Sequence, residues 1–325
     1  MWLRGLSRGI LTELNRAVTS KAGHTMQGNR QLARVYVTRR IPREALRLLQ
    51  DSGICDVKHW DSDDPVPRTE LLKGVAGIDG LYCLLTEKID KELLDAAGPK
   101  LKVISTMSVG FDHLSPEEIK KRGIRVGYTP DVLTNATAEL TVALLLATAR
   151  RLMEAVAEAK NGGWGTWKPM WLCGNGLSDS TVGIVGLGRI VPLDKLAEQS
   201  DFVTVHCALT PETNGLCNKD LFSKMKKTAV FINTSSCLFL HRGAVVNQND
   251  LYQALTTGQI GSAGLDVTVP EPLPTDHPLF ALKNCVILPH VASATIATRT
   301  AMAVLTVNNL LAGLKDEPMP KELTL

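Results

Sequence analysis

The stretch from Ser180 to Ile190, STVGIVGLGRI, constrains the fold more than any other part of this chain. A short apolar run is followed directly by Gly186-Leu187-Gly188, which is typical of a buried parallel strand that opens into a glycine-rich turn. Such a turn lets backbone N–H groups approach a pyrophosphate, which the N-terminus of the next helix then holds. The sequence therefore predicts an α/β fold with a nucleotide-binding turn.

This turn is incomplete. The third glycine of the G-x-G-x-x-G pattern falls at Val191, and Pro192 follows it, so the expected helix does not begin here. A complete unit would continue with a helix, a second strand and a residue that reads the ribose 2′ position, and about 35 residues of that succession are absent. We therefore expect the strand at 182–185 to lie at a sheet edge with an uncovered apolar face. The choice between NAD and NADP cannot be argued from this segment.

Length and composition exclude several classes of protein. The 325 residues suffice for two domains with their own cores, and a net charge of +3 does not indicate a nucleic-acid partner. The longest apolar run, 142–147, is far shorter than the roughly 18 residues of a membrane span, so we expect no membrane segment. Seven scattered cysteines, none in a C-x-x-C pair, indicate reduced thiols. We expect a cytoplasmic protein without a metal site.

Residues 1–30 differ from the rest of the chain, because basic residues outnumber the single acid, Glu13, and leucines recur at helical spacing. Two interpretations remain open for this basic N-terminal extension. It has the Arg-rich, acid-poor profile of a mitochondrial presequence, and it is also compatible with a disordered extension. A mitochondrial location is therefore the alternative to a cytoplasmic one.

Strand and helix patterns alternate from residue 34 onward, which predicts parallel sheets. Strands are expected at 35–37, 81–85, 103–105, 125–127, 182–185, 202–207, 229–232, 263–267 and 285–288. Helices are expected at 42–50, 89–97, 116–122, 135–160, 194–199, 219–225, 249–257 and 295–314. The helix at 135–160 is apolar nearly all round in its first half, so we expect it to be buried between layers.

The loop after that long helix contains Trp164, Trp167 and Trp171, three of the five tryptophans. Clustered tryptophans on a loop are typical of a subunit interface or of an active-site wall. Local packing of a long loop is the alternative interpretation, and the sequence does not decide between them.

Four loops that follow strands carry polar groups suited to chemistry: 108–112, 233–243, 266–274 and 289–290. N–H groups beside Gly110 can bind a carboxylate, and Arg242 can form a bidentate pair with one. A histidine held by a carboxylate, here His290 with Glu271, is the common device for proton transfer. Taken singly, each group also has a structural explanation, as a plain turn, a solvated arginine or a satisfied histidine.

The order of these motifs, GLGRI, then Arg-Gly, then LDVTVPEPLP, then ILPH, resembles the D-isomer-specific 2-hydroxyacid dehydrogenases. The stretches STMSVGFDHL, PDVLTNATAEL, NGGWGTWKPMWLCG and LPHVASAT are similar to the glyoxylate/hydroxypyruvate reductases of that family. The resemblance runs from about Arg34 to the C-terminus. It is interrupted after Ile190, and by SCLFLH at 236–241, which looks inserted between Ser235 and Arg242.

The resemblance implies two Rossmann-like domains with parallel sheets, the cofactor domain being truncated. After the extension at 1–30, residues 31–132 would begin the substrate-binding domain, 133–296 would form the NAD(P)-binding domain, and 297–325 would return to the first. The implied reaction is NAD(P)H-dependent reduction of 2-oxo acids, hydroxypyruvate to D-glycerate and glyoxylate to glycolate, with NADPH or NADH as cofactor. The family also implies a homodimer through the cofactor domain.

By position, the resemblance makes His290 the group that protonates the substrate carbonyl, held in its charged form by Glu271, with Arg242 as the third catalytic residue. The other implied substrate-binding residues are Val109, Gly110, Asp266 and Ser293, and the implied cofactor-binding residues are Gly186, Gly188, Arg189, Ile190, Thr234 and Asp266. Six inserted residues would displace Arg242, and a shift of about 1 Å can cost a hundredfold in rate.

Two alternatives follow from the interrupted turn. The chain would be a catalytically impaired variant that acts only as a binding or dimerisation partner, or a corepressor-like, nucleotide-sensing relative. Phosphoglycerate dehydrogenase activity is less favoured, because no extra arginine cluster lies near 108–112 to hold a phosphate.

Overall fold

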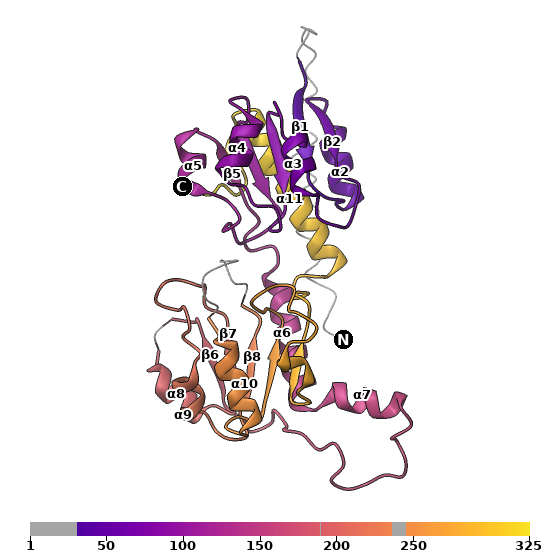
Figure 1. Ribbon diagram of the computed structural model, residues 1–325, viewed down its shortest axis with the longest axis vertical. Helices are drawn as coiled ribbons and strands as arrows, with labels where there is room; N and C mark the ends of the chain where they lie inside the picture. The colour runs from indigo at the N-terminus through magenta and orange to yellow at the C-terminus, as the bar shows by residue number, and fades with distance from the viewer. Residues whose placement is uncertain (1–30, 189, 236–244) are drawn as a thin grey trace, which may run out of the picture. The chain divides into compact units, whose positions relative to one another are not determined.

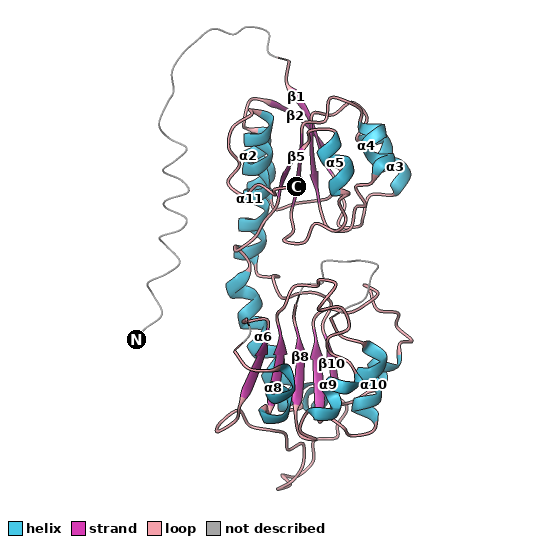
Figure 2. Ribbon diagram, turned by 90° about the vertical axis from the view of Figure 1, so that its left-hand side faces the viewer, coloured by secondary structure: helices cyan, strands magenta, loops and turns pink. Residues whose placement is uncertain are grey.

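The computed structural model describes residues 31–188, 190–235 and 245–325. Residues Ala33–Leu325 form one compact unit that holds two five-stranded sheets, and every pair of neighbouring strands is parallel. Figures 1 and 2 show these sheets with helices packed against them. The predicted α/β class with parallel sheets is confirmed.

The first sheet has the strand order β2-β1-β3-β4-β5, so its first strand in the chain has a neighbour on each side. Its strands are β1 (Ala33–Val37), β2 (Cys55–His59), β3 (Gly80–Cys83), β4 (Val103–Thr106) and β5 (Arg125–Gly127). Its helices are α2 (Arg43–Gln50), α3 (Arg68–Gly74), α4 (Lys91–Ala97) and α5 (Pro116–Lys121). Neither β2 nor α3 was expected. The polar alternation of β2, CDVKH, leaves a single buried residue, which is a weak strand signal.

Helix α11 (Ile296–Leu314) returns the chain to the first sheet, where it packs against β3, β4 and β5. The Ser105 hydroxyl of β4 donates a hydrogen bond of 2.8 Å to the carbonyl of Thr306. Met302, Val307 and Leu310 of α11 enter the same apolar cluster as the β1 valines. The C-terminal segment therefore stabilises the sheet that the beginning of the described chain forms.

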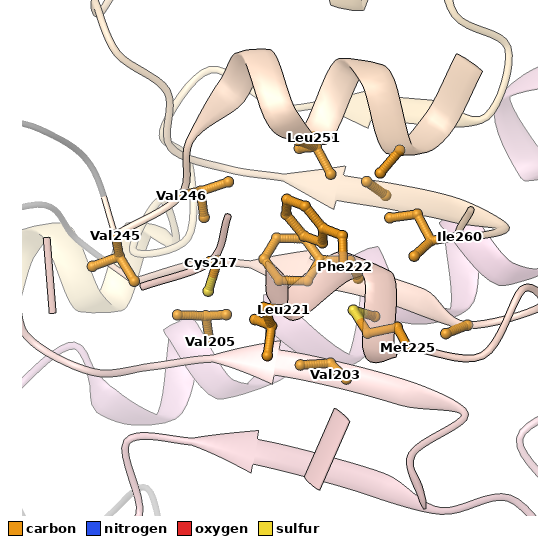
Figure 3. Close-up of a cluster of buried hydrophobic side chains, with 14 of the residues drawn as sticks. Val203, Val205, Cys217, Leu221, Phe222, Met225, Val245, Val246, Leu251 and Ile260 are labelled. Carbon is orange, nitrogen blue, oxygen red and sulfur yellow. The ribbon is translucent and has the colours of Figure 1, made fainter. Parts of the chain in front are cut away.

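The second sheet has the order β10-β9-β8-β7-β6. Its strands are β6 (Val182–Val185), β7 (Phe202–Val205), β8 (Val230–Asn233), β9 (Ser262–Leu265) and β10 (Cys285–Ile287). Helices α8 (Leu193–Gln199), α9 (Lys219–Lys224) and α10 (Gln248–Thr256) join these strands, and the 3-10 helix η1 (Pro278–Ala281) precedes β10. Figure 3 shows the core beneath α9 and α10, where Leu221, Phe222 and Leu251 pack with Val203 and Val205 of β7.

Strand β6 is the edge of this sheet, as predicted. Within the described residues it pairs with β7 alone, and Val182 and Ile184 are 40% and 42% exposed. Helix α8 leads directly from β6 to β7, with Pro192 at its N-cap. The crossover therefore replaces the longer helix–strand succession that a nucleotide-binding turn normally opens.

The expected single helix at 135–160 is wrong, because the chain forms two helices, α6 (Thr134–Ala149) and α7 (Leu152–Lys160). Arg151 between them adopts a left-handed backbone conformation with φ of 52°, which ends α6 and redirects the chain. Its guanidinium donates two hydrogen bonds to Glu154. Helix α6 is also less buried than expected: Leu144 and Leu145 pack on the sheet, whereas Val142 is exposed.

Helix α7 and the loop after it leave a large apolar surface exposed, and Figure 1 shows them extending beyond the strands of the second sheet. Trp164 and Trp167 are 71% and 81% exposed, so local packing does not account for these two side chains. No buried residue belongs to α7. In the part of the chain that the structure describes, every helix is too short or too polar to cross a membrane.

Candidate active site

A cavity of about 920 Å³ lies where the carboxyl ends of strands from both sheets meet, which is where open α/β sheets bind ligands. From the first sheet it is lined by the segments after β3 and β4. From the second it is lined by the turn after β6, the segment after β8, and the loops after β9 and β10. Predicted site residues that line it are Val109, Gly110, Gly186, Thr234, Glu271, His290 and Ser293. Distant parts of the sequence thus form one site.

His290 and Glu271 form the central pair of this cavity. His290 Nδ1 lies 2.8 Å from Glu271 Oε2, and the second carboxylate oxygen accepts the Thr268 N–H at 2.9 Å. The hydrogen bond to Glu271 raises the pKa of His290, and this effect outweighs the opposing effect of burial. Because Nδ1 faces Glu271, Nε2 is the ring nitrogen that remains for a bound substrate. This arrangement suits a general acid.

Asp266 does not line the cavity, in contrast to the role that the resemblance implied. Its buried carboxylate accepts the backbone N–H groups of Val291 and Ala292, each at 2.8 Å. Burial raises the pKa of Asp266, and those two N–H groups oppose the rise. Asp266 therefore holds the loop after β10, which carries His290 and Ser293.

The carboxylate-binding loop, residues 108–112, is fixed by a chain of buried side chains. His113 Nε2 lies 3.0 Å from Thr106 Oγ1, which lies 2.7 Å from Ser108 Oγ, and the Ser108 hydroxyl donates to the Gly110 carbonyl at 2.6 Å. Since each hydroxyl has a single proton, Thr106 donates to Ser108, and His113 donates to Thr106 from Nε2. Burial lowers the pKa of His113 to about 4, which keeps it neutral. These bonds fix the loop that carries Val109 and Gly110.

Three charged residues of the cavity, Arg39, Asp112 and Arg299, were missed by sequence reasoning. Arg299, in the first turn of α11, lines the cavity, and burial lowers the pKa of its guanidinium. It is the single charged residue of the apolar stretch 296–314, which is the signal that would have identified it. Asp112 also lines the cavity, and burial raises the pKa of its carboxyl to about 6. Arg299 supplies positive charge beside His290.

The cofactor-side residues divide into two groups. Gly186, with φ of 116°, needs glycine, because a Cβ there would lie 2.6 Å from the backbone nitrogen of Cys207. Thr234 Oγ1 lies 2.7 Å from Thr141 Oγ1 of α6, at the wall of the cavity. In contrast, Gly188 and Ile190 do not line the cavity. Arg189, Arg242 and the insertion at 236–241 lie outside the described residues.

The residues present fit the two ends of a nicotinamide dinucleotide unequally. The hydroxyl-lined wall at Thr234 and Ser235 suits the nicotinamide end, whereas Gly186 belongs to the turn that normally approaches the pyrophosphate. The helix that should receive the pyrophosphate is replaced by α8. The N-cap residue of α8 is Pro192, which has no backbone N–H to offer a phosphate. Among the residues that the structure describes, the adenosine end does not find its usual contacts. Within the described ranges, no cluster of three His, Cys, Asp or Glu side chains is arranged to hold a metal ion.

Comparison with known proteins agrees with this geometry. The family model for the D-isomer specific 2-hydroxyacid dehydrogenase NAD-binding domain matches residues 142–191 and 189–292, and the match breaks at the incomplete turn. The glyoxylate reductase/hydroxypyruvate reductase of Homo sapiens is 59% identical over 91% of this chain and 99% of that protein. The glyoxylate reductase of Thermofilum pendens is 45% identical over 88% of this chain and 93% of that protein.

Solved structures show the same relationship. The crystal structure of the TT0316 protein from Thermus thermophilus is 42% identical and has a TM-score of 0.83, covering 90% of this chain and all of that one. The NADPH-dependent glyoxylate/hydroxypyruvate reductase of Sinorhizobium meliloti, solved with NADP and malonate, is 28% identical, with a TM-score of 0.72 over 90% of this chain and 97% of that one. The chain therefore belongs to the D-isomer-specific 2-hydroxyacid dehydrogenases, a family of NAD(P)-dependent oxidoreductases.

Proposed function

We propose that this chain reduces small 2-oxo acids, hydroxypyruvate to D-glycerate and glyoxylate to glycolate, with NADPH or NADH as the hydride source. The observation that carries the proposal is the pair of His290 and Glu271, 2.8 Å apart, in a cavity that also contains the carboxylate-binding loop. The relatives named as glyoxylate and hydroxypyruvate reductases support this choice of substrates. Neither the described geometry nor the relatives favour the binding-only or corepressor-like alternatives.

Each residue has a role that follows from its position. A bound reduced nicotinamide supplies the hydride. His290 delivers a proton from Nε2 to the carbonyl oxygen, and Glu271 keeps the imidazole charged until then. The N–H groups of Val109 and Gly110 and the guanidinium of Arg299 attract the substrate carboxylate. The same positive charges stabilise the developing alkoxide, since they are already in place within a partly enclosed site.

The direct test is to incubate the purified chain with NADPH and hydroxypyruvate, and to follow the loss of reduced-nicotinamide absorbance. We expect D-glycerate as the product, identified by chiral separation, and glycolate when glyoxylate replaces hydroxypyruvate. Absence of turnover in a sample that binds NADPH, as judged by nicotinamide fluorescence and a raised melting temperature, would contradict the proposed reaction.

We also propose that two copies of the chain associate through the surface of α7 and the loop after it. Exposed large side chains gather there, and aromatic residues and methionine are enriched in such interfaces. The exposed residues are Leu152, Met153, Val156, Trp164, Trp167 and Met170. Light scattering should give the mass of a dimer, and the double variant Met153→Asp, Trp167→Ser should give a monomer. A monomeric unmodified chain would contradict this.

We propose that the protein is located in the cytoplasm, because its described cysteines are unpaired. The composition of residues 1–30 makes mitochondria the alternative location. The six described cysteines are free thiols. A fluorescent protein fused to the C-terminus should distribute through the cytoplasm. Mitochondrial signal that disappears when residues 1–30 are deleted would establish the alternative.

A further inference from the structure

We infer that this site binds the nicotinamide end of its cofactor and does not read the adenosine ribose, so that it accepts reduced nicotinamide mononucleotide and does not distinguish NADH from NADPH. This inference rests on the proposed function, because it concerns the cofactor of the same reaction. It follows from the strand order of the second sheet, from the side chains around the turn after β6, and from the intact opposite side of the site.

The strand order removes the position from which the ribose is normally read. In a dinucleotide-binding sheet, the residue that contacts the 2′ position follows a second strand, which lies beside the strand that precedes the glycine turn. Here that first strand is β6, and within residues 31–188, 190–235 and 245–325 its one paired neighbour is β7. Strand β7 lies on the side toward β8, the side on which His290 and Glu271 follow β10 and β9. The side that should hold the adenosine is a bare sheet edge.

The described side chains at this edge, which leave out Arg189, cannot replace the missing contact. Leu187 and Ile190 are 66% and 76% exposed, and Val191 is also exposed. These apolar side chains offer no hydrogen bond to a ribose hydroxyl and no charge to a 2′-phosphate. Pro192, at the N-cap of α8, lacks the N–H that a helix N-terminus would offer a phosphate. The adenosine half would therefore extend into solvent.

The side of the site toward β8, to which we assign the nicotinamide end, is held by buried hydrogen bonds. Asn233, at the end of β8, accepts the backbone N–H of Ser235 at 3.1 Å and the Ser235 hydroxyl at 2.5 Å, and both groups are buried. These bonds fix Thr234 and Ser235 against the cavity. Gly186 makes its close backbone approach to Cys207 on the other wall. The residues that we assign to the nicotinamide ring are therefore held in place, whereas no described residue is placed to recognise the adenosine ribose.

The expected selectivity follows from this asymmetry. A site that hydrogen-bonds a particular hydroxyl rejects an analogue without it by about 10⁴-fold or more, because its own polar groups are left unpaired. A site without such groups loses nothing when the 2′ substituent changes. A 2′-phosphate in solvent gains little from distant charges, because surface electrostatics are screened. We therefore expect dissociation constants for NADH and NADPH within about threefold of each other, and a constant for the mononucleotide within about tenfold of both.

The experiment is a fluorescence titration of the full chain with reduced nicotinamide mononucleotide, NADH and NADPH in parallel. Similar affinities for all three would support the inference. A preference for one dinucleotide of more than about tenfold, or failure of the mononucleotide to bind saturably, would overturn it. Binding of all three without reduction of hydroxypyruvate would contradict the proposed function and leave this inference standing. Reduction of hydroxypyruvate with a strong preference for NADPH would support the proposed function and overturn this inference.

The variant Arg189→Ser tests the charged residue of the turn segment 186–191. Arg189 lies outside the described residues, so its effect on cofactor binding is measured directly. If the inference is correct, this variant changes the affinities for NADH and NADPH by the same factor. A loss of affinity for NADPH alone would show that Arg189 reads the 2′-phosphate, and would overturn the inference. Its effect is read from binding, so it does not depend on turnover.

Discussion

The two sheets of this protein are built from the same number of parallel strands, but their first strands have different surroundings. Strand β1 lies between β2 and β3, and its Val35 and Val37 are buried. Strand β6 has β7 on one side, and its alternate side chains remain partly exposed. An apolar strand sequence therefore does not determine burial by itself. Burial depends on whether a later segment returns to cover the strand, and in the second sheet that segment is missing.

The largest expected effect concerns His290, which follows β10 at the edge of the second sheet opposite to the exposed strand β6. The substitution His290→Gln should lower kcat for hydroxypyruvate by about 10²- to 10⁴-fold, because it removes the proton donor, while leaving nicotinamide binding unchanged. Steady-state kinetics and fluorescence titration measure the two quantities. His59→Gln, in the outer strand β2, is the matched control and should retain its kcat. Equal kcat values for His290→Gln and the unmodified chain would remove His290 from the acid role.

The next prediction compares burial in the two sheets with one residue type. Ile104 in β4 is fully buried and Ile184 in β6 is 42% exposed. Ile104→Ala should lower the free energy of unfolding by about 2–5 kcal/mol, because it leaves a cavity in a packed core. Ile184→Ala should cost less than about 1 kcal/mol, since solvent already reaches the side chain. Urea denaturation measures both. Equal losses would show that β6 is covered in solution, for example by a second copy.

Sequence reasoning identified the features whose causes are local. The strand–turn pattern at 182–188 predicted β6, and the absence of a helix pattern after Ile190 predicted the exposed edge, because both depend on a few adjacent residues. The pairing of His290 with Glu271 was also predicted, and the structure places them 2.8 Å apart. The carboxyl ends of parallel strands meet at one edge of a sheet, so loops that are distant in sequence come together there.

What sequence reasoning missed depends on three-dimensional context. The lone charge of Arg299 in an apolar stretch marks it in the sequence, but its entry into the cavity depends on the path of α11 to the first sheet. The break in the helix at Arg151 depends on its left-handed backbone, which sequence patterns disfavour for arginine. The resemblance implied a ligand-binding role for Asp266, and the structure adds that its carboxylate accepts the backbone N–H groups of Val291 and Ala292. A buried carboxylate that holds a loop cannot be distinguished from a binding residue by its sequence position.

The buried histidine of the first sheet should make that sheet sensitive to acid. Burial lowers the pKa of His113 to about 4, below the unfolded value of 6.5. Its contribution to stability is therefore fully present above pH 6.5, and is lost as the pH falls through 4, with a total of about 3 kcal/mol. His113→Gln keeps a donor for Thr106 but cannot titrate, so its stability should fall less as the pH is lowered from 6.5 to about 4, the window between the unfolded and folded pKa values. Parallel stability curves for the two proteins would contradict the assignment.

The histidine of the second sheet has the opposite sign and the smallest expected effect. Glu271 raises the pKa of His290, so the charged form that donates the proton persists to higher pH than for an isolated imidazole. Its contribution to stability is fully present below the unfolded pKa and is lost as the pH rises through the folded one.

Glu271→Gln removes the charge but keeps a hydrogen-bonding side chain. The alkaline limb of the kcat/KM profile should therefore move to lower pH, with a smaller loss at acid pH than His290→Gln causes. A profile that is merely scaled down, without displacement of its alkaline limb, would show that Glu271 orients the ring without setting its charge. Since His290 and Glu271 both follow strands far from β6, a displaced limb would also show that the exposed edge leaves the electrostatics of this end of the sheet intact.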